Sequence, residues 1–594
     1  MLRLALPAVL IVVLVLGAVW SDRTMPRAEI TYVDASPAFT LDPQRIAYEQ
    51  DIRFGNALYE GLVRWHPETF DILPGIAERW EVGGEGVRYT FHLRENARWS
   101  NGDPVRAGDF VHSWRRGLLP DTAGDYSKIF FMLKGGRAFF EWRARELREY
   151  AARPASERTK EAAEELWGRT VERFEEGVGV RAMDERTLVV ELERPLPYAL
   201  DLLAFVPTFP AHPPTIDAYS RVDAGSGRLE QDHGWTKPPH LVSSGPFVLT
   251  SWRFKRDMRL ERNPFYWDVG SVRSESIEAK VIEDPNTRVL AFRTGAADWV
   301  TDVHADYLLE LLAEAAGSER PTIRGFDRYG TYFWSFNCTL TLAGGRSNPF
   351  ADARVRRAFS MAVDKRAIVE DLRGVGEHAA ETLVPRGTIR GYDEDGSIRG
   401  LGHDPAGARE ELARAGWRLR DGGEVRNDRG ETFPVVTLLA STGSYHVLVA
   451  QAMASMWEKT LGVRTSIVVK ETKTYRDDLK RRDYMVARGG WFADYADPTS
   501  FLNIHVSGDG NNDRGYSSAE FDQLMREASE EREPAARMAI LERAEQLSID
   551  EAPIVPIWVY RQFYQYDASR LTGVCTHPRM IQFLHLLQKK GDAP

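Results

Sequence analysis

A short acidic pattern near residue 510 is the closest approach of the chain to a metal-binding motif. Asp509, Asn511 and Asp513 alternate as in a calcium loop, and Glu520 stands at the twelfth position. The sixth position, where the sharp turn of such a loop needs glycine, is Arg514. The pattern therefore favours a polar surface loop over a calcium site.

Patterns typical of enzymes are missing from the sequence as well. It contains no HExxH, GxSxG or GxxxxGK[ST] pattern, and no GxGxxG after a strand-like segment. The 13 histidines are scattered, and His212, His233 and His240 lie in a proline-rich region without a carboxylate at helical spacing. We therefore expect a protein that is not an enzyme and that uses no metal or cofactor.

Composition narrows the class further. The 594 residues include 77 basic and 87 acidic side chains, a net charge of −10, so nucleic acid is an unexpected partner. Only two cysteines are present, which excludes a disulfide framework and any multi-cysteine metal site. Cys338 and Cys575 could form one bridge in an oxidising compartment, or remain two separate thiols.

The N-terminus predicts export. Residues 4–20 carry no charge and follow Arg3. This stretch is long for a signal-peptide core and short for a spanning helix. No cysteine follows it for lipid attachment, and Trp20 stands where a cleavage site needs a small residue. Residues 1–27 are therefore either a signal peptide or a membrane anchor, and the rest of the chain lies outside the cytoplasm.

The body alternates strand-like and helix-like segments. Short β-rich runs occur at residues 30–34, 60–65, 89–94, 187–193, 245–252 and 279–284, and helical periodicity occurs at 289–297, 304–316 and 352–373. Residues 136–179 are rich in Glu, Arg and Ala, and Pro154 divides them into two predicted helices, 138–151 and 156–177. The segment at 434–482 alternates strand, helix, strand and helix, which indicates an α/β lobe.

Several stretches together resemble one family, the family-5 solute-binding proteins of ABC importers, in the oligopeptide-binding branch. The longest are residues 91–116 (FHLRENARWSNGDPVRAGDFVHSWRR) and 490–503 (GWFADYADPTSFLN). Shorter ones are Leu41-Asp42-Pro43, Tyr59-Glu60-Gly61-Leu62, Glu261-Arg262-Asn263-Pro264, Tyr266-Trp267, Asn337, Arg354-Val355-Arg356-Arg357-Ala358, Ala544-Glu545-Gln546 and Ala552-Pro553-Ile554. The resemblance covers roughly residues 30–585.

The resemblance implies an α/β fold, a periplasmic-binding-protein-like two-lobed clamp of type II with an additional domain, three domains in all. Lobe I would be discontinuous, and the hinge strands would lie near 326–332 and 557–563. The implied boundaries are 28–58, 196–329 and 561–594 for lobe I, 59–195 for the additional domain with a helical insertion at 138–177, and 330–560 for lobe II.

The resemblance also implies a peptide site. In this family an aspartate in a GW-x-x-D-Y motif binds the α-amino group of the peptide, and here that position is Asp494. A carboxylate suits this task because charge-assisted hydrogen bonds are about twice as strong as neutral ones. Trp491 and Tyr495 would frame the same pocket, and Tyr126 falls where the family has a ligand-facing tyrosine.

The backbone of residues 488–491, which includes Gly490, would pair with an extended peptide, and Arg488 matches a family arginine. Cations for the carboxylate end are less defined. Lys480, Arg481 and Arg482 lie close to where the family can place them, and Arg373 is a further candidate. A basic run is also typical of a solvated helix face, so both interpretations stay open.

Three positions depart from the family pattern. Ala47 and Glu49 stand where Glu and Val are usual, and Thr472 stands where Trp is usual. These departures leave the size and polarity of the side-chain pockets open.

The resemblance implies that the chain captures oligopeptides for an ABC permease with ATPase subunits, as a monomer. The same fold could instead bind a dipeptide, a metal chelate or an oligosaccharide. A third possibility is a membrane-tethered sensing protein that docks a partner through the insertion at 138–177.

Overall fold

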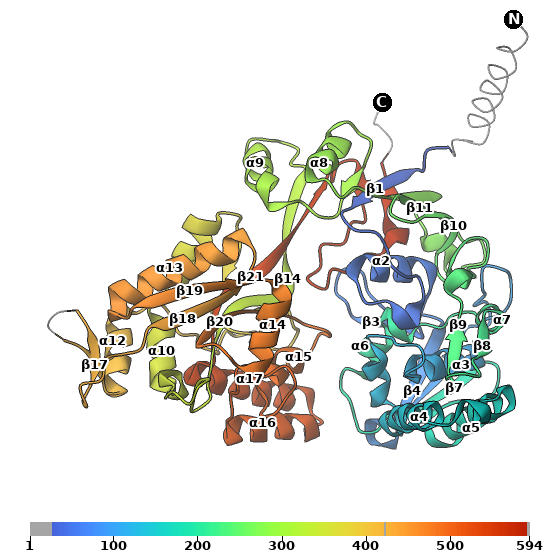
Figure 1. Cartoon of the computed structure of the whole chain (residues 1–594). Helices are drawn as coiled ribbons and strands as arrows, with labels where there is room; N and C mark the ends of the chain where they lie inside the picture. Colours follow the sequence, from blue (N-terminus) through green and yellow to red (C-terminus); the bar gives the residue numbers. More distant parts are fainter. Residues whose placement is uncertain (1–25, 421–422, 591–594) are drawn as a thin grey trace, which may run out of the picture.

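The computed structural model describes residues 26–420 and 423–590, which form two lobes joined by two long strands (Figure 1). The predicted signal peptide or anchor at residues 4–20 lies outside the described residues. Within the part that is described, no helix has both the length and the apolar character needed to cross a membrane.

An 11-stranded sheet extends through both lobes in the order β10-β11-β12-β1-β13-β21-β14-β20-β18-β19, with β15 paired to β21. Its strands are β1 (Ile30–Asp34), β10 (Phe247–Arg253), β11 (Asp257–Arg262), β12 (Ser276–Val281), β13 (Trp299–Val300), β14 (Ile323–Phe336), β15 (His378–Ala379), β18 (Val436–Ser441), β19 (Thr465–Lys470), β20 (Val486–Phe492) and β21 (Ile554–Tyr566). All five residues of β1 are buried, as is usual for a strand in parallel pairing with neighbours on both sides.

Two strands cross from one lobe to the other. β14 has 14 residues and β21 has 13, and they pair antiparallel between the lobes (Figure 1). Their register shifts between Asp327 and Thr331, and again between Tyr332 and Phe333. A register shift interrupts the ladder of hydrogen bonds and bends the strands locally. The first irregularity falls within the segments in which the hinge was predicted, 326–332 and 557–563, and the second lies at their edge.

The N-terminal half is built on one continuous core. A four-stranded antiparallel sheet, β4 (Ala77–Gly83), β5 (Arg88–Leu93), β7 (Thr187–Glu191) and β6 (Val180–Ala182), packs against α3 (Ala107–Leu118). Phe91 and Trp114 of this unit belong to the same cluster of buried residues as Ile30 and Trp299 of the large sheet. The residues of the predicted additional domain are thus packed directly onto lobe I, and the exact domain boundaries stay a prediction.

The predicted helical pair at 138–177 is confirmed, with different starting points. α4 (Gly136–Ala151) begins two residues earlier than predicted, and α5 (Lys160–Gly177) begins four residues later. A short 3-10 turn follows Pro154, and the side chain of Thr159 then accepts a hydrogen bond from the backbone of Ala162 to cap α5. A buried ion pair of 2.7 Å between Arg143 and Asp121 fixes the pair of helices to the rest of the lobe.

The second lobe contains the predicted α/β alternation, β18, α13 (Ser444–Leu461), β19 and α14 (Thr472–Arg481), together with α10 (Ala353–Met361), α12 (Pro405–Arg414), α16 (Ala519–Glu530) and α17 (Pro534–Glu551). The single helix predicted at 352–373 is wrong, because the chain leaves the helix after Met361 and Asp364 caps a separate helical segment.

Both cysteines are free thiols. Cys338 packs against a core of the second lobe, and Cys575 belongs to the core of the first. The alternative of a bridge between them is therefore wrong for this structure.

Candidate ligand-binding site

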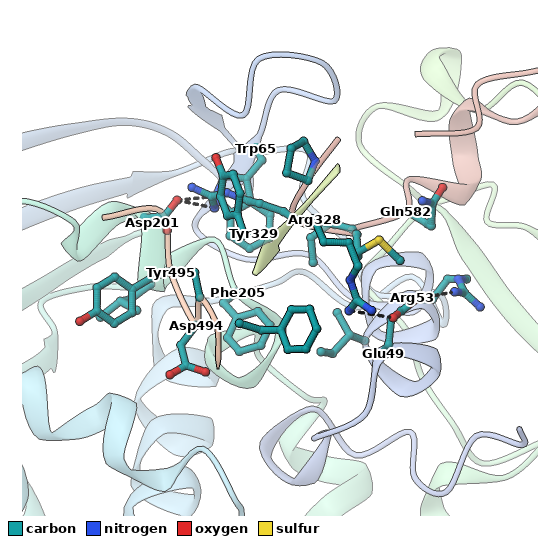
Figure 2. Close-up of a pocket in the computed structure, with 18 of the residues that line it drawn as sticks. Glu49, Arg53, Trp65, Asp201, Phe205, Arg328, Tyr329, Asp494, Tyr495 and Gln582 are labelled. Atoms are coloured by element: carbon teal, nitrogen blue, oxygen red, sulfur yellow. Dashed lines mark hydrogen bonds and ion pairs between the residues drawn. The ribbon is translucent and has the colours of Figure 1, made fainter. Parts of the chain in front are cut away.

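A cavity of about 250 Å³ lies where the two lobes face each other beside the crossing strands (Figure 2). The first lobe contributes side chains from residues 47–53, from Trp65 and Tyr126, and from residues 201–205. The second contributes residues 492–495, and residues 328–329 of β14 and 578–582 of the C-terminal segment complete the walls. A ligand in this cavity would touch both lobes at once.

Asp494 lines this cavity from the loop that follows β20 (Figure 2). The loop is held firmly, because the backbone N–H of Asp494 donates to the Ser500 hydroxyl at 2.8 Å and the Trp491 indole donates to the Ser500 carbonyl at 2.6 Å. Among the described residues, no group donates a hydrogen bond to the Asp494 carboxylate. Asp494 keeps contact with solvent, and its partial burial by the surrounding walls raises the pKa of the carboxyl.

Two of the predicted aromatic residues lie beside Asp494. Tyr126 lines the cavity, and burial together with the charge of Asp494 raises the pKa of its phenol. Tyr495 also lines the cavity and stacks on Tyr198 of the opposite lobe, with ring centroids 4.3 Å apart. The structure therefore brings Tyr126, Asp494 and Tyr495 together.

The other residues of the motif lie behind the cavity, along β20. Trp491 is half-buried against the core of the second lobe. Gly490 allows the close approach of Tyr560, whose hydroxyl would lie 2.6 Å from an added Cβ. These two positions support the strand that carries Asp494 and are not among the residues that line the cavity.

One edge of β20 is open over much of its length. β14 pairs with β20 along the whole strand, from Val486 to Phe492. On the other edge, β18 pairs only with Val486 and Ala487. Residues 488–492 therefore have one backbone edge without a strand partner in the described part of the chain.

Arg488 and Arg373 flank one group of stacked aromatic rings. The guanidinium of Arg488 lies 5.6 Å from the centre of the Tyr332 ring, and that ring stacks on Trp558 at 3.8 Å. Arg373 lies 5.2 Å from the Trp558 ring. Burial and the charges of both arginines lower the pKa of His446 to about 3, so this histidine is neutral.

The two arginines differ in their partners. Arg373 donates to both oxygens of Glu377, at 2.8 and 2.9 Å. Arg488 has no carboxylate partner within the described residues; its side chain interacts with the Tyr475 hydroxyl, and its Nε is buried without a partner. Arg488 is consequently the cation of this cluster that is left for a ligand.

The three cations of the predicted basic run have partners within the second lobe. Lys480 pairs with Asp513 at 2.8 Å and Arg481 with Asp478 at 2.7 Å, while Arg482 donates to the Asn512 carbonyl at 3.4 Å. None of them lines the cavity. A role for them at the carboxylate end of a ligand stays a prediction, without support from this geometry.

Sequence reasoning missed several residues of the cavity. Asp201 accepts hydrogen bonds from Trp65 at 2.8 Å and from the backbone of Ala496 at 3.3 Å, and it pairs with Arg579 at 2.6 Å (Figure 2). Arg328 lies against Phe492, with its guanidinium 4.4 Å from the ring centre. No local pattern marks these residues, because their partners are distant in sequence.

Comparison with known proteins assigns the chain to a family. The family model described as bacterial extracellular solute-binding proteins, family 5 Middle, matches residues 71–513. The chain belongs to this solute-binding family. The periplasmic oligopeptide-binding protein OppA of Salmonella typhimurium is 30% identical to this family-5 chain over 535 residues, 89% of the chain and 86% of the relative. The dipeptide-binding protein DppE of Bacillus subtilis is 28% identical over 525 residues, 88% and 85% of the two chains.

Solved structures agree with the two-lobed architecture. The unliganded open form of MppA, a periplasmic murein tripeptide binding protein, has a TM-score of 0.75 at 25% identity and covers 95% of this chain and 98% of its own. OppA of Haemophilus influenzae in complex with the peptide RPPGFSPFR has a TM-score of 0.65 at 25% identity, with coverage of 95% and 100%. The family-5 chain therefore has the type II periplasmic-binding-protein fold with more than two domains, as predicted, and it is similar in arrangement to an open form.

Proposed function

We propose that this family-5 protein is the peptide-binding component of an ABC importer. It captures short peptides outside the cytoplasmic membrane by closure of its lobes, and it delivers them to a transmembrane permease driven by ATPase subunits. The observation that carries the proposal is the Asp494 carboxylate, which faces the cavity between the lobes without a hydrogen-bond partner in the described part of the chain.

The α-amino group of the peptide is the natural partner of this carboxylate. Every unmodified peptide has such an ammonium group, so an anchor for it recognises peptides irrespective of sequence. Tyr126 and Tyr495 line the same cavity as Asp494 and provide flat aromatic walls. Desolvation by these walls strengthens a charge-assisted pair once the lobes close.

The open edge of β20 is suited to the peptide backbone. Residues 488–492 can pair with an extended chain as an added strand. Such pairing uses only main-chain groups and therefore tolerates different side chains. The affinity then depends on the backbone, while the pockets between the lobes select among sequences.

Arg488 is placed to receive the carboxylate end. It lies on β20, six residues before Asp494 of the following loop, a span of at most about 20 Å at roughly 3.3 Å per residue. An extended peptide advances by a similar distance per residue. Peptides of up to about six residues therefore fit between the two charges.

The crossing strands β14 and β21 supply the hinge. Their register shifts lie between the lobes, where a change in backbone angles moves one lobe against the other with little change inside either. We retain the predicted boundaries as part of the proposal: lobe I at 28–58, 196–329 and 561–594, the additional domain at 59–195, and lobe II at 330–560. The protein acts as a monomer and is tethered by residues 4–20 if this segment is uncleaved.

The names of relatives support peptides as the cargo. They include an oligopeptide-binding, a dipeptide-binding and a murein peptide-binding protein. Other relatives are described as a probable deoxycholate-binding protein and a heme-binding protein. The free carboxylate of Asp494 favours a ligand with a positive charge, and so it favours the peptides.

Native mass spectrometry of the protein without residues 1–25, followed by denaturing release, tests the proposal. We expect a set of co-purified masses that fragment as short peptides, or retention of peptides from an added mixture. A single non-peptide mass would contradict the peptide cargo. Failure to retain any peptide from a mixture of free-amino peptides would contradict the function as a whole.

A further inference from the structure

The charged side chains that line the cavity differ in whether they have hydrogen-bond or ion-pair partners. The lining includes Glu49, Arg53, Asp201, Arg328, Asp494 and Arg579. Four of these take part in close pairs: Arg53 donates to Asp34 at 2.5 Å and to Glu49 at 3.2 Å, and Arg579 pairs with Asp201 at 2.6 Å. Within the described residues, Asp494 and Arg328 make no side-chain hydrogen bond. The cavity therefore presents one anion without a close partner, Asp494, and one cation, Arg328, whose only carboxylate neighbour among the described residues is Glu49 at 3.8 Å.

Neighbouring side chains hold Arg328 in place, but its hydrogen-bond donors do not all have acceptors. Its guanidinium lies 4.4 Å from the centre of the Phe492 ring and 3.8 Å from Glu49, beyond hydrogen-bond distance, and its Nε is buried without a partner (Figure 2). A guanidinium has five N–H donors in a planar fork that matches a carboxylate. The buried Nε is costly without an acceptor, and a ligand carboxylate could accept from it and from a terminal nitrogen together.

The position of Arg328 limits where this carboxylate can lie. Phe492, which the guanidinium covers, is two residues before Asp494, or about 7 Å along an extended chain. The ligand carboxylate therefore lies one or two residues from the ammonium group at Asp494. Arg488, by contrast, lies at the far end of the open edge of β20 and would meet the end of a longer peptide.

We infer that Arg328 is a second electrostatic anchor of the cavity, which binds a ligand carboxylate one or two residues from the amino end. The inference deepens the proposed peptide-binding function and depends on it. Two sources provide this chemistry: an acidic side chain at the first or second residue, and the C-terminus of a dipeptide. The family resemblance gives no reason to expect such an arginine.

Glu49 is the positioning residue of this anchor. It stands where the family usually has valine, and its carboxylate lies between Arg53 and Arg328. Its own charge opposes an incoming carboxylate, while its pull on the guanidinium holds Arg328 at the cavity wall. Glu49→Gln should therefore raise affinity for an acidic ligand, whereas Arg328→Gln should lower it. Two variants with opposite effects on the same ligand cannot both reflect damage to the fold.

Calorimetric titration with matched peptides tests the inference. The side-chain arm compares Ala-Glu-Ala-Ala and Glu-Ala-Ala-Ala with their Gln counterparts, and the terminal arm compares Ala-Ala with its amide. For the wild type we expect a preference for the carboxylate of about tenfold or more in at least one arm. That preference should fall below about twofold in Arg328→Gln and persist partly in Arg328→Lys.

Arg79→Gln is the matched control, because Arg79 pairs with Glu81 at 2.7 Å on β4, outside the cavity. It should keep the wild-type preference, and unchanged thermal midpoints would show that all variants are folded. Equal affinities within each pair for the wild type, or a preference that survives in Arg328→Gln, would overturn the inference while leaving the peptide function intact. Binding of no peptide at all would overturn the peptide function and this anchor with it.

Discussion

The loop after β20 carries two aspartates in opposite surroundings, Asp497 on its buried side and Asp494 on the side of the cavity. On the buried face, Asp497 accepts two hydrogen bonds from Arg537, at 2.7 and 2.9 Å, and both side chains are 5% exposed. It also accepts from the backbone and hydroxyl of Thr499. On the cavity face, three residues earlier, Asp494 has no such partner among the described residues. The same loop satisfies one carboxylate completely and leaves the other free.

The difference indicates that the Asp497 carboxylate stabilises the fold and that the Asp494 carboxylate is available to a ligand. A buried carboxylate that has its partners holds the loop in place, and removal of one partner leaves a charge in the core. An unpaired carboxylate in a cleft makes the free protein less stable and is useful only when a ligand supplies the cation. The contrast predicts that substitutions at the Asp497 pair change mainly the stability of the protein, whereas substitutions at Asp494 change mainly its affinity for ligand.

The largest effect is expected from Arg537→Ala. This change leaves Asp497 buried without its main partner, so the free energy of unfolding should fall by about 3–5 kcal/mol. Urea unfolding followed by tryptophan fluorescence measures the loss. Peptide affinity should fall as well, because the loop that carries Asp494 loses its support.

Arg532→Ala is the matched control on the same lobe. Arg532 pairs with Glu85 of the other lobe at 3.0 Å, but the two side chains are 65% and 76% exposed. An exposed pair contributes at most about 1 kcal/mol, so this variant should unfold close to the wild type. Equal losses of unfolding free energy in Arg537→Ala and Arg532→Ala would contradict the claim that burial makes the Asp497 pair important for stability.

A smaller effect of opposite sign is expected from Asp494→Asn in the absence of ligand. The pKa of Asp494 is raised in the folded protein, so its ionised form opposes folding once the pH exceeds the ordinary pKa of an aspartate. The variant should therefore have a higher thermal midpoint than the wild type at neutral pH. The difference should vanish toward about pH 3, where the carboxyl is protonated in both folded and unfolded chains. A lower midpoint for the variant at neutral pH would mean that Asp494, like Asp497, is a structural residue.

The smallest effect is expected from Lys480→Gln. The Lys480 ammonium is exposed and paired with Asp513, so its loss should change stability by less than about 1 kcal/mol. Peptide affinity should be unchanged, because the side chain does not line the cavity. A clear loss of affinity for peptides with a free carboxylate would instead support the carboxylate role that the sequence predicted for this run.

Much of the fold followed from local patterns. The strands and helices of residues 434–482 match their predicted ranges closely, since each has a clear hydrophobic period and a turn at its ends. The helix predicted at 352–373 failed because one polar cap, Asp364, starts a new segment inside an otherwise helical pattern. Helical periodicity alone does not show such an interruption, because apolar residues continue on both sides of Asp364.

The candidate site was only partly predictable. Asp494, Tyr495 and Tyr126 were identified because a long motif resembles a known family, and the structure brings them together. Arg328 and Arg579 reach the cavity from a crossing strand and from the C-terminal segment, without a motif of their own. Their contribution depends on how distant segments pack, which no spacing in the sequence encodes.

Calorimetric titration of one tripeptide with a free or an N-acetylated amino end, on the wild type and on Asp494→Asn, tests the central claim most directly. Acetylation removes the ammonium charge from the ligand, and the substitution removes the carboxylate charge from the protein. We expect the wild type to bind the free peptide at least about tenfold more tightly than the acetylated one. The variant should bind both weakly and equally. Equal affinities of the wild type for the two peptides would contradict the assignment of Asp494 as the amino anchor.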